Sequence, residues 1–269
     1  MGYLLLILFL IFTVPASARP ADPLPQLPTV LKQQGKAGTV ERVVDGDTLV
    51  LAPSGREIRL VGIQAPKLAL GRAGFKIWPL AHEARRALIG LTMGKKLNVY
   101  FGGARRDRHG RVLGHLARVR DGLWIQGALL RHGWARVYSF ADNQTAVSEM
   151  LALERAARQE KLGIWGMRFY QIVPASKAGR FIGSFQLVEG QVTKTAVIRR
   201  WAYINFGANW RKDFTISIPR KRLRGFRKRF GRNLRQLEGK HIRVRGWLRA
   251  FNGPMIKATH MEQIEVITP

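Results

Sequence analysis

The sequence predicts a mainly β chain with helices, an α+β protein made of two small β-barrels in tandem, the first of which carries three helices. Short segments that alternate or are rich in β-branched residues recur in both halves, separated by Gly, Pro and Asp turn signals. Three segments of the first half instead place apolar residues at helical spacing. With 269 residues and 46% hydrophobic composition, the chain can bury the cores of two small domains.

The N-terminal residues are typical of an export signal rather than of a folded element. An apolar run over residues 3–14 precedes the tripeptide Ala16-Ser17-Ala18, the pattern of a secretory cleavage site. We therefore predict that residues 1–18 are a signal peptide and that the mature chain, periplasmic or secreted, begins at Arg19. Because the segment contains no Lys or Arg, the alternative is an uncleaved anchor that holds the chain on the outer side of the cytoplasmic membrane.

The first domain is expected over residues 37–170, after a tether. Residues 19–36 hold four prolines and no clear hydrophobic periodicity, which predicts a linker. Strand and helix patterns then alternate as far as residue 161. The predicted strands cover residues 39–44, 48–52, 57–63, 95–101 and 112–119, and the predicted helices cover residues 80–91, 124–132 and 145–161.

The second domain is expected over residues 185–269. The segment 171–184 mixes Pro, Ser, Gly and Lys, which predicts a second linker. After it the pattern is all-strand, interrupted by one basic insert, and about five short strands suit a small Greek-key barrel. The predicted strands cover residues 185–197, 200–206, 214–218, 241–248 and 264–267.

The charge of the chain indicates the class of its partner. The formal net charge is +29, and a positive field of this size attracts polyphosphates, so nucleic acid is the expected partner. If the charge is the only guide, the alternative partner is anionic lipid or a cell-wall polymer. The absence of cysteine excludes disulfides and thiolate metal sites. No motif indicates a protein partner.

Five motifs follow one another through the first domain. They are VVDGDTL at residues 43–49, IRLVGIQAPK at 58–67, DRHGR at 107–111, LLRHGWARV at 129–137 and KLGIW at 161–165. In order and spacing this set resembles the thermonuclease (staphylococcal nuclease-like) family over residues 37–166. The resemblance implies an OB-type barrel with three helices, and an activity that hydrolyses phosphodiester bonds of DNA or RNA.

The resemblance also implies a catalytic pocket. Arg59 and Arg111 match the two arginines that clamp the phosphate, a task suited to guanidinium groups because they bind oxygens bidentately and stay charged. Asp47 and the main-chain carbonyl of Ala65 match two of the family's calcium ligands, but Gln64 stands where a second aspartate is expected. An amide brings no charge, so calcium is expected to be weakened or dispensable relative to the family.

Lys67 is the larger departure from the family pattern. The family has at this position a glutamate that is usually assigned as the general base, and an ammonium cannot accept a proton. In one interpretation hydrolysis is lost, and Lys67 adds a third cation to an exported nucleic-acid-binding protein. In the other, repulsion from the neighbouring arginines lowers the pKa of Lys67, so that a fraction of neutral amine serves as the base. Alternatively, the ammonium replaces the electrostatic role of calcium.

Further residues are candidates for binding nucleic acid. His109 lies in the motif at 107–111, in a turn where the family often places a nucleotide-facing side chain, and an exposed turn histidine is the alternative. Tyr138 directly follows the motif at 129–137 and could stack on a base, with a core aromatic as the alternative. The second domain resembles small OB-fold nucleic-acid modules, with a solvated cationic face as the alternative. Its basic insert supplies the remaining candidates, which are Arg220, Lys221, Arg222, Arg224, Arg227, Lys228 and Arg229.

Overall fold

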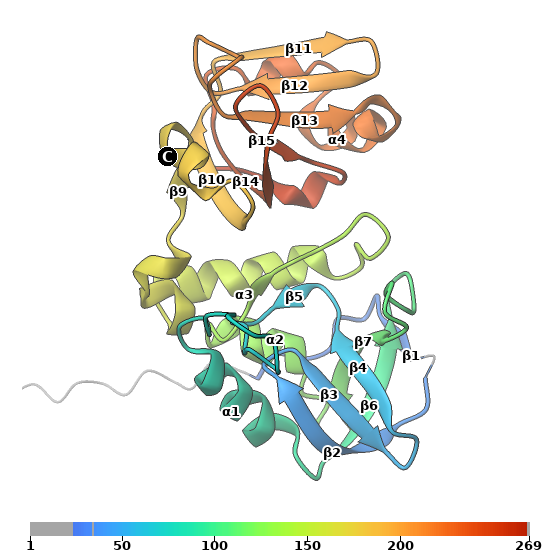
Figure 1. Cartoon of the computed structure of the whole chain (residues 1–269). Coiled ribbons are helices and arrows are strands. Elements are labelled where there is room, and N and C mark those ends of the chain that lie inside the picture. The colour runs from blue at the N-terminus through green and yellow to red at the C-terminus, as the bar shows by residue number, and fades with distance from the viewer. Residues whose placement is uncertain (1–23, 34, 268–269) are drawn as a thin grey trace, which may run out of the picture.

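The structure is a computed structural model that describes residues 24–33 and 35–267. Figure 1 shows two domains stacked on one another, with helix α3 (Val147–Gln159) lying between the two sheets. The predicted signal peptide lies outside the described residues. Within the described residues, no helix is both long and apolar enough to cross a bilayer.

The first domain is built on a closed barrel of five strands. They are β2 (Gly38–Asp45), β3 (Thr48–Ala52), β4 (Arg56–Leu60), β6 (Lys96–Phe101) and β7 (Val112–Arg118). Antiparallel pairs join β2 to β3, β3 to β4, β6 to β7 and β2 to β6, and a parallel pair joins β4 to β7. The sheet therefore closes on itself, which leaves its inner face to form a core.

Helices and short strands cover this barrel. The helices are α1 (Ala81–Thr92), α2 (Ile125–Arg131) and α3, followed by the 3-10 turns η1 (Gly163–Gly166) and η2 (Arg168–Tyr170). Two short strands, β5 (Ile63–Gln64) and β8 (Arg136–Val137), pair antiparallel outside the barrel. These bounds agree with the predicted helices to within two residues at each end, because α1 and α3 have apolar residues at helical spacing and α2 is an almost continuously buried apolar segment.

The second domain contains the other large sheet. Its strands are β9 (Val173–Pro174), β10 (Phe185–Gln191), β11 (Lys194–Ile198), β12 (Trp201–Asn205), β13 (Thr215–Pro219), β14 (His241–Ala250), β15 (Pro254–Lys257) and β16 (Ile264–Val266). Between them lie helix α4 (Leu223–Phe230) and the 3-10 turns η3 (Ala175–Phe181), η4 (Arg220–Arg222), η5 (Leu234–Leu237) and η6 (Met261–Gln263).

The second sheet follows the same order of strand pairings as the first barrel. Strand β12 pairs with β13, β13 pairs parallel with β15, and β15 pairs with β14. The first strand is divided, because β10 pairs with β14 while β11 pairs with β12. At the step between them, the Val192 N–H donates to Lys240 and the Thr193 N–H donates to Asn205. The single strand predicted over residues 185–197 is thus two strands, each of which pairs with a different neighbour.

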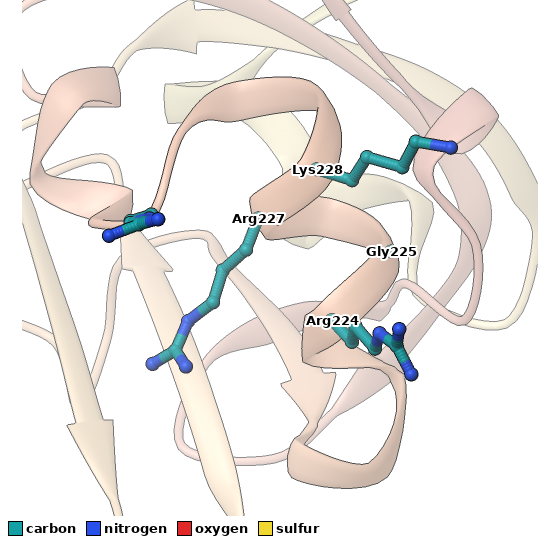
Figure 2. A pocket seen from close by; sticks show the side chains of 5 residues that line it. Arg224, Gly225, Arg227 and Lys228 are labelled. Carbon is teal, nitrogen blue, oxygen red and sulfur yellow. The ribbon is translucent and has the colours of Figure 1, made fainter.

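Helix α4 carries much of the basic insert. Phe226 is buried and Phe230 is half-buried, and their rings stack 6.4 Å apart on the face that meets the domain core. Figure 2 shows Arg224, Arg227 and Lys228 extending away from this helix in different directions. Together with Gly225 and Arg232 they line an open hollow of about 590 Å³. The insert is therefore a short amphipathic helix with an exposed cationic side.

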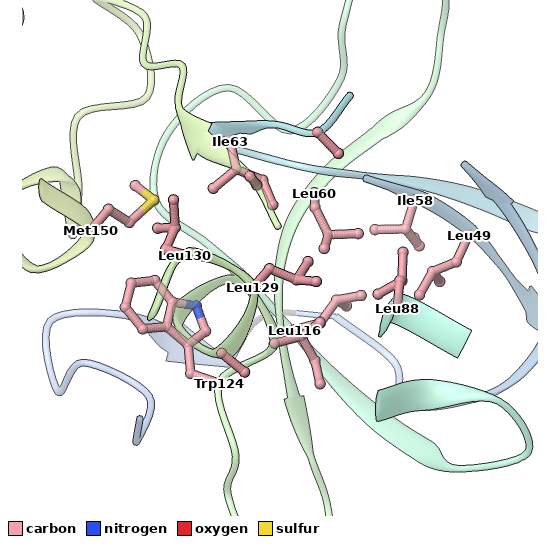
Figure 3. Packing of buried hydrophobic residues seen from close by; sticks show 14 of the residues in the cluster. Leu49, Ile58, Leu60, Ile63, Leu88, Leu116, Trp124, Leu129, Leu130 and Met150 are labelled. Atoms are coloured by element: carbon pink, nitrogen blue, oxygen red, sulfur yellow. The ribbon is translucent and has the colours of Figure 1, made fainter. Parts of the chain in front are cut away.

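Each domain has its own hydrophobic core. Figure 3 shows the first core, in which Leu49, Ile58 and Leu60 from the barrel meet Leu88 of α1 and Leu129 of α2. The second core forms between the other sheet, α4 and η5, and it contains Phe214 and Phe226. The buried apolar side chains therefore form two separate clusters, one in each domain.

A buried ion-pair network joins the two domains. Arg245 of β14 donates to Glu154 of α3 from both terminal nitrogens, at 2.9 and 3.0 Å, and to Glu265 of β16 at 2.6 Å. Arg158 of α3 also contacts Glu154 and Glu265, at 3.4 and 3.2 Å. Burial alone would raise the pKa of Glu265, but the charges of Arg245 and Arg158 lower it to about 2.

Both predicted linkers are partly folded, which corrects their assignment. Residues 24–33 lie on the first barrel, because β1 (Lys32–Gln33) pairs with β6 and Leu31 is buried. Within 171–184, β9 pairs parallel with β10 and η3 packs beside it. Strand β15, which the sequence did not predict, lies between β13 and β14. Proline and small polar residues concealed these segments, since β9 and β15 each contain a proline at one end.

Candidate active site

The turn between β2 and β3 forms the centre of the candidate site. Asp45 pairs with Thr48 across the hairpin, and the Asp47 N–H donates to the Asp45 carboxylate at 3.0 Å. A side chain at Gly46 would meet the Cβ atom of Ala65 at 2.6 Å. Glycine is therefore required where this turn passes under the segment after β5, and the turn directs Asp47 inward.

The Asp47 carboxylate is fully buried and surrounded by donors. Lys67 Nζ donates to Oδ2 at 2.8 Å and to Oδ1 at 3.1 Å. The Ala65 N–H donates to Oδ2 at 2.7 Å, and Arg59 Nη2 lies 3.2 Å from the same oxygen. Burial opposes ionisation, but the charges of Arg59 and Lys67 hold the pKa of Asp47 well below its usual range. The structure thus brings Asp47, Arg59, Ala65 and Lys67 together.

Arg59 points into this cluster rather than toward solvent. Its Nη1 donates to the carbonyls of Leu60 and Asp47, at 2.7 and 3.2 Å, and its Nη2 donates to that of Ile63 at 2.7 Å. Its side chain is 11% exposed. In this arrangement Arg59 fixes the backbone around Asp47, and its terminal nitrogens are already engaged.

Gln64 is held by an arginine that the motif analysis did not single out. Arg136 donates from Nε and Nη2 to the Gln64 Oε1 atom, at 3.0 and 2.7 Å, across the β5–β8 pair. Burial lowers the pKa of Arg136 to about 10. Its guanidinium lies 4.7 Å from the ring centroid of Phe185, which belongs to the second domain. The amide oxygen therefore accepts two charged donors.

Asp45 is a second carboxylate beside Lys67, at 3.8 Å from the ammonium. Burial, and then the negative charge of Asp47, raises the pKa of Asp45 to about 6. The sequence places it in the motif without indicating this environment. The Lys67 ammonium therefore lies within ion-pair distance of two buried carboxylates at the turn, those of Asp45 and Asp47.

Arg111 lies at the start of β7 and is held by its own turn. Asp107 accepts from Arg111 Nε at 2.8 Å and lies 2.7 Å from Nη2, while Glu57 lies 3.9 Å from Nη1. The side chain is 33% exposed. Val112 pairs with Ile58, which directs Arg111 and Glu57 to the same side of the sheet as Arg59. His109 is exposed in this turn, where it accepts from Arg108 at 3.1 Å.

The donor set does not fit calcium. A calcium ion takes six to eight oxygen ligands with open lone pairs. Here the oxygens of Asp47 accept from Lys67 and the Ala65 N–H, and the Gln64 oxygen accepts from Arg136. The positive charges of Lys67, Arg59 and Arg136 thus already contact the oxygens that a calcium ion would need. Among the described residues, no group of three or more His, Cys, Asp or Glu side chains could hold a metal ion.

The segment after β8 leads from this site to the second domain. The Tyr138 N–H donates to the Gly62 carbonyl at 2.8 Å. The Tyr138 ring lies 4.8 Å from Phe140 and 4.7 Å from Phe185, and its hydroxyl accepts from Trp247 Nε1 at 2.8 Å. Tyr138 is thus packed at the domain junction, while Phe140 and Trp247 are 49% and 46% exposed.

The basic insert is not part of the cluster around Asp47. Its seven candidates belong to η4 and α4, and all of them are exposed. The structure therefore separates the predicted residues into the buried cluster, the Arg111 turn, the junction aromatics and the cationic helix. Asp45 and Arg136 lie inside two of the motifs, and Glu57 lies one residue before a third, but the sequence indicated no role in the site for any of them. The hydrophobic context of Arg136, between Ala135 and Val137, is the signal that indicates its burial.

Comparison with known proteins places the first domain in a family. The model of the family described as "Staphylococcal nuclease homologue" matches residues 57–167. The "Uncharacterized endonuclease" of Escherichia coli is 34% identical over 131 residues, which cover 48% of this chain and 76% of that protein. The "Probable staphylococcal-like nuclease CAN1" of Oryza sativa subsp. japonica is 34% identical over 108 residues, 40% of this chain and 28% of that protein.

The matches cover about half of the chain, and the family-model match ends before the second domain begins. The "Endonuclease YhcR" of Bacillus subtilis is 29% identical over 139 residues, again 48% of this chain but 11% of that protein. The closed five-stranded barrel is the OB-type barrel of this family. Through its first domain, the chain belongs to the staphylococcal nuclease family.

Proposed function

We propose that this chain binds nucleic acid and hydrolyses its phosphodiester bonds in the candidate active site without calcium. The observation that carries the proposal is the contact of Lys67 Nζ with both oxygens of Asp47, at 2.8 and 3.1 Å. An ammonium so placed supplies positive charge where the family relies on a calcium ion. Relatives named as endonucleases support the nuclease type of activity.

Electrostatic stabilisation would do most of the chemistry. When water attacks a phosphodiester, negative charge grows on the phosphoryl oxygens, and fixed cations at those positions lower the barrier. Lys67 and Arg111 have side chains that are 21% and 33% exposed, so both can meet a substrate. Arg59 is engaged with backbone carbonyls, and we assign it the task of holding the pocket in shape.

The proposed reaction has no positioned carboxylate at residue 67 to take a proton from the attacking water. Lys67 cannot do so, because as an ammonium it donates to Asp47 and has no free lone pair. The proton would pass to solvent water during attack. General base catalysis contributes about 10²- to 10⁴-fold in enzymes, so we expect turnover to be slow by a comparable factor.

Binding without cleavage is the second candidate function. It is favoured by the engagement of both Arg59 and Lys67 with groups of the protein itself. In this case Arg111 and the exposed cations of η4 and α4 would hold a nucleic acid that is not cut. Export from the cytoplasm is also part of the proposal, and it rests on the sequence pattern of residues 1–18.

The experiment is incubation of the purified chain with labelled single-stranded DNA and RNA in the presence of a chelator. Slow cleavage that disappears in Arg111→Ala supports hydrolysis. Binding of the oligonucleotide without any cleavage product supports the second candidate function, binding without hydrolysis. If the chain neither binds nor cleaves either oligonucleotide at low salt, the proposed function is wrong, and anionic vesicles then become the next partner to measure.

A further inference from the structure

A small pocket lies at the junction of the two domains, outside the candidate active site. Its volume is about 190 Å³. Gln144 comes from the first domain, and all of the other lining residues come from the second. They are Lys221, Arg222, Gly225, Phe226, Thr259, His260 and Met261. We refer to it as the junction pocket.

The junction pocket has the charge and the polar groups of a phosphate site. Lys221 and Arg222 are exposed, and neither pairs with a carboxylate among residues 24–33 and 35–267. Burial, followed by the charges of Arg245 and Arg222, lowers the pKa of His260 to about 4, so the ring is neutral at neutral pH. The two cations are therefore free to bind an anion.

The polar wall of the pocket is fixed by a chain of hydrogen bonds. His260 Nε2 contacts the Ser139 hydroxyl at 2.8 Å, and His260 Nδ1 contacts the Thr259 hydroxyl at 3.2 Å. Gln263 Oε1 accepts from the Thr259 N–H at 2.7 Å. The Ser139–His260 contact attaches the pocket to the segment that follows β8 and leaves the active site.

The distance from the active site to the junction pocket has an upper limit, which is set by the chain that connects them. Arg136, which holds Gln64, precedes Gln144 by eight residues. A chain of this length spans at most about 29 Å. The buried network around Arg245 fixes the two domains against one another, so a ligand that uses both sites need not order them first.

The aromatic side chains at the junction favour a single strand over a duplex. Phe140 and Trp247 are about half exposed, and both contact Tyr138. Exposed rings stack on unpaired bases, which a duplex does not offer. We propose that the junction pocket binds a backbone phosphate of a single-stranded nucleic acid whose reacting phosphodiester lies in the candidate active site. This inference rests on the proposed function.

The test compares three forms of the full chain, which are the unaltered protein, Lys221→Gln with Arg222→Gln, and Lys177→Gln with Arg180→Gln. The last pair lies in η3, is exposed, and removes the same charge. Figure 1 shows η3 at the other side of the second sheet from α4. Each form is titrated with a 20-nucleotide single strand and, by competition, with a dinucleotide that has one phosphodiester.

The junction variant should bind the 20-nucleotide strand about tenfold more weakly than the η3 variant does. The slope of log affinity against log salt should become shallower by about 0.7, since the pocket neutralises one phosphate and each single-strand phosphate contact contributes about 0.7. Dinucleotide affinity should be the same in all three forms.

Equal losses in the junction and η3 variants would overturn the inference, because they indicate general charge attraction. A matching loss for the dinucleotide would also overturn it, since the pocket would then belong to the active site. If the unaltered protein binds neither ligand, the proposed function itself fails, and that result is distinct from both of the others.

Discussion

At the scale of single residues, the chemistry of the pocket depends on which groups pair with Asp47 and Gln64, the two side chains at the calcium positions. Asp47 is paired with Lys67, and Gln64 with Arg136. Through the resemblance of its motifs, the sequence predicted that Asp47, Arg59, Ala65 and Lys67 belong to one site. It could not predict Arg136 as the partner of Gln64, because the two residues are 72 positions apart and meet only through the β5–β8 pair.

The sequence also gave no indication that Arg59 would be engaged by backbone carbonyls. The motif predicts an arginine at this position, but the direction of its side chain depends on where the chain turns after β4. Leu60, Ile63 and Asp47 present their carbonyls to it there. The motif therefore predicted the residue types of the site, and the contacts between distant segments set their orientations.

Arg111 is the residue that we expect to matter most for transition-state stabilisation. Replacing it with alanine should lower the cleavage rate by about 10²-fold while leaving the fold intact, because it removes a fixed cation from the exposed side of the pocket. Single-turnover rates with a labelled oligonucleotide measure the effect. Arg108→Ala, in the same turn but directed to His109, is the matched control and should change the rate by less than about threefold.

At the scale of elements, α3, β14 and β16 form the connection between the domains. Glu154 of α3 also accepts from the Val137 N–H at 2.6 Å, so the network extends to β8. The sequence predicted all three elements, because their apolar periodicity is regular. It did not predict that the polar residues Glu154, Arg245 and Glu265 would be buried, since burial of charge requires a partner from a distant element.

Arg245→Ala should destabilise the protein by about 3–5 kcal/mol, because it leaves two carboxylates buried without their central cation. Denaturant unfolding followed by tryptophan fluorescence measures the change. We also expect one cooperative transition in the unaltered protein to separate into two in the variant.

The control is Arg243→Ala on the same strand. Arg243 pairs with Glu189 at 2.7 Å, with both side chains partly exposed, and such pairs contribute about 0–1 kcal/mol. Equal effects of the two substitutions would show that the buried network does not carry the stability of the junction.

At the scale of the whole molecule, the two domains share one order of strand pairings, and both place a helix between their third and fourth strands. The sequence predicted two small barrels of similar type, but no internal repeat between the halves indicated the order in which their strands pair. Pairing order depends on which distant strands become neighbours, whereas the sequence pattern fixes mainly where each strand lies. The predicted α+β class with a closed barrel was nevertheless confirmed for the first domain.

The whole molecule should lose stability in mild acid through a buried histidine. Burial lowers the pKa of His115 to about 3, against about 6.5 for an exposed histidine. Below pH 6.5 the unfolded chain takes up a proton that the folded chain does not. Stability is therefore lost as pH falls from about 6.5 toward 3, by up to about 1.4 kcal/mol per pH unit from this residue.

Substitution of the residue isolates this contribution. His115 packs 5.8 Å from Trp124, and its Nδ1 atom has no hydrogen-bond partner among the described residues. In His115→Leu, the free energy of unfolding should fall less steeply between pH 6.5 and 4 than in the unaltered protein, measured with urea at each pH. Parallel curves for the two proteins would contradict the buried neutral ring.

The central claim is that Lys67 replaces calcium, and the measurement that tests it most directly is the ratio of cleavage rates with calcium and with chelator. We expect a ratio below about twofold in the unaltered protein, because the carboxylate already has its cation. In the double variant Lys67→Glu with Gln64→Asp, which restores the family's two carboxylates, cleavage should become faster and depend on calcium by about 10²-fold or more. Strong calcium dependence of the unaltered protein would contradict the account, since it would mean that the ion displaces Lys67 from Asp47.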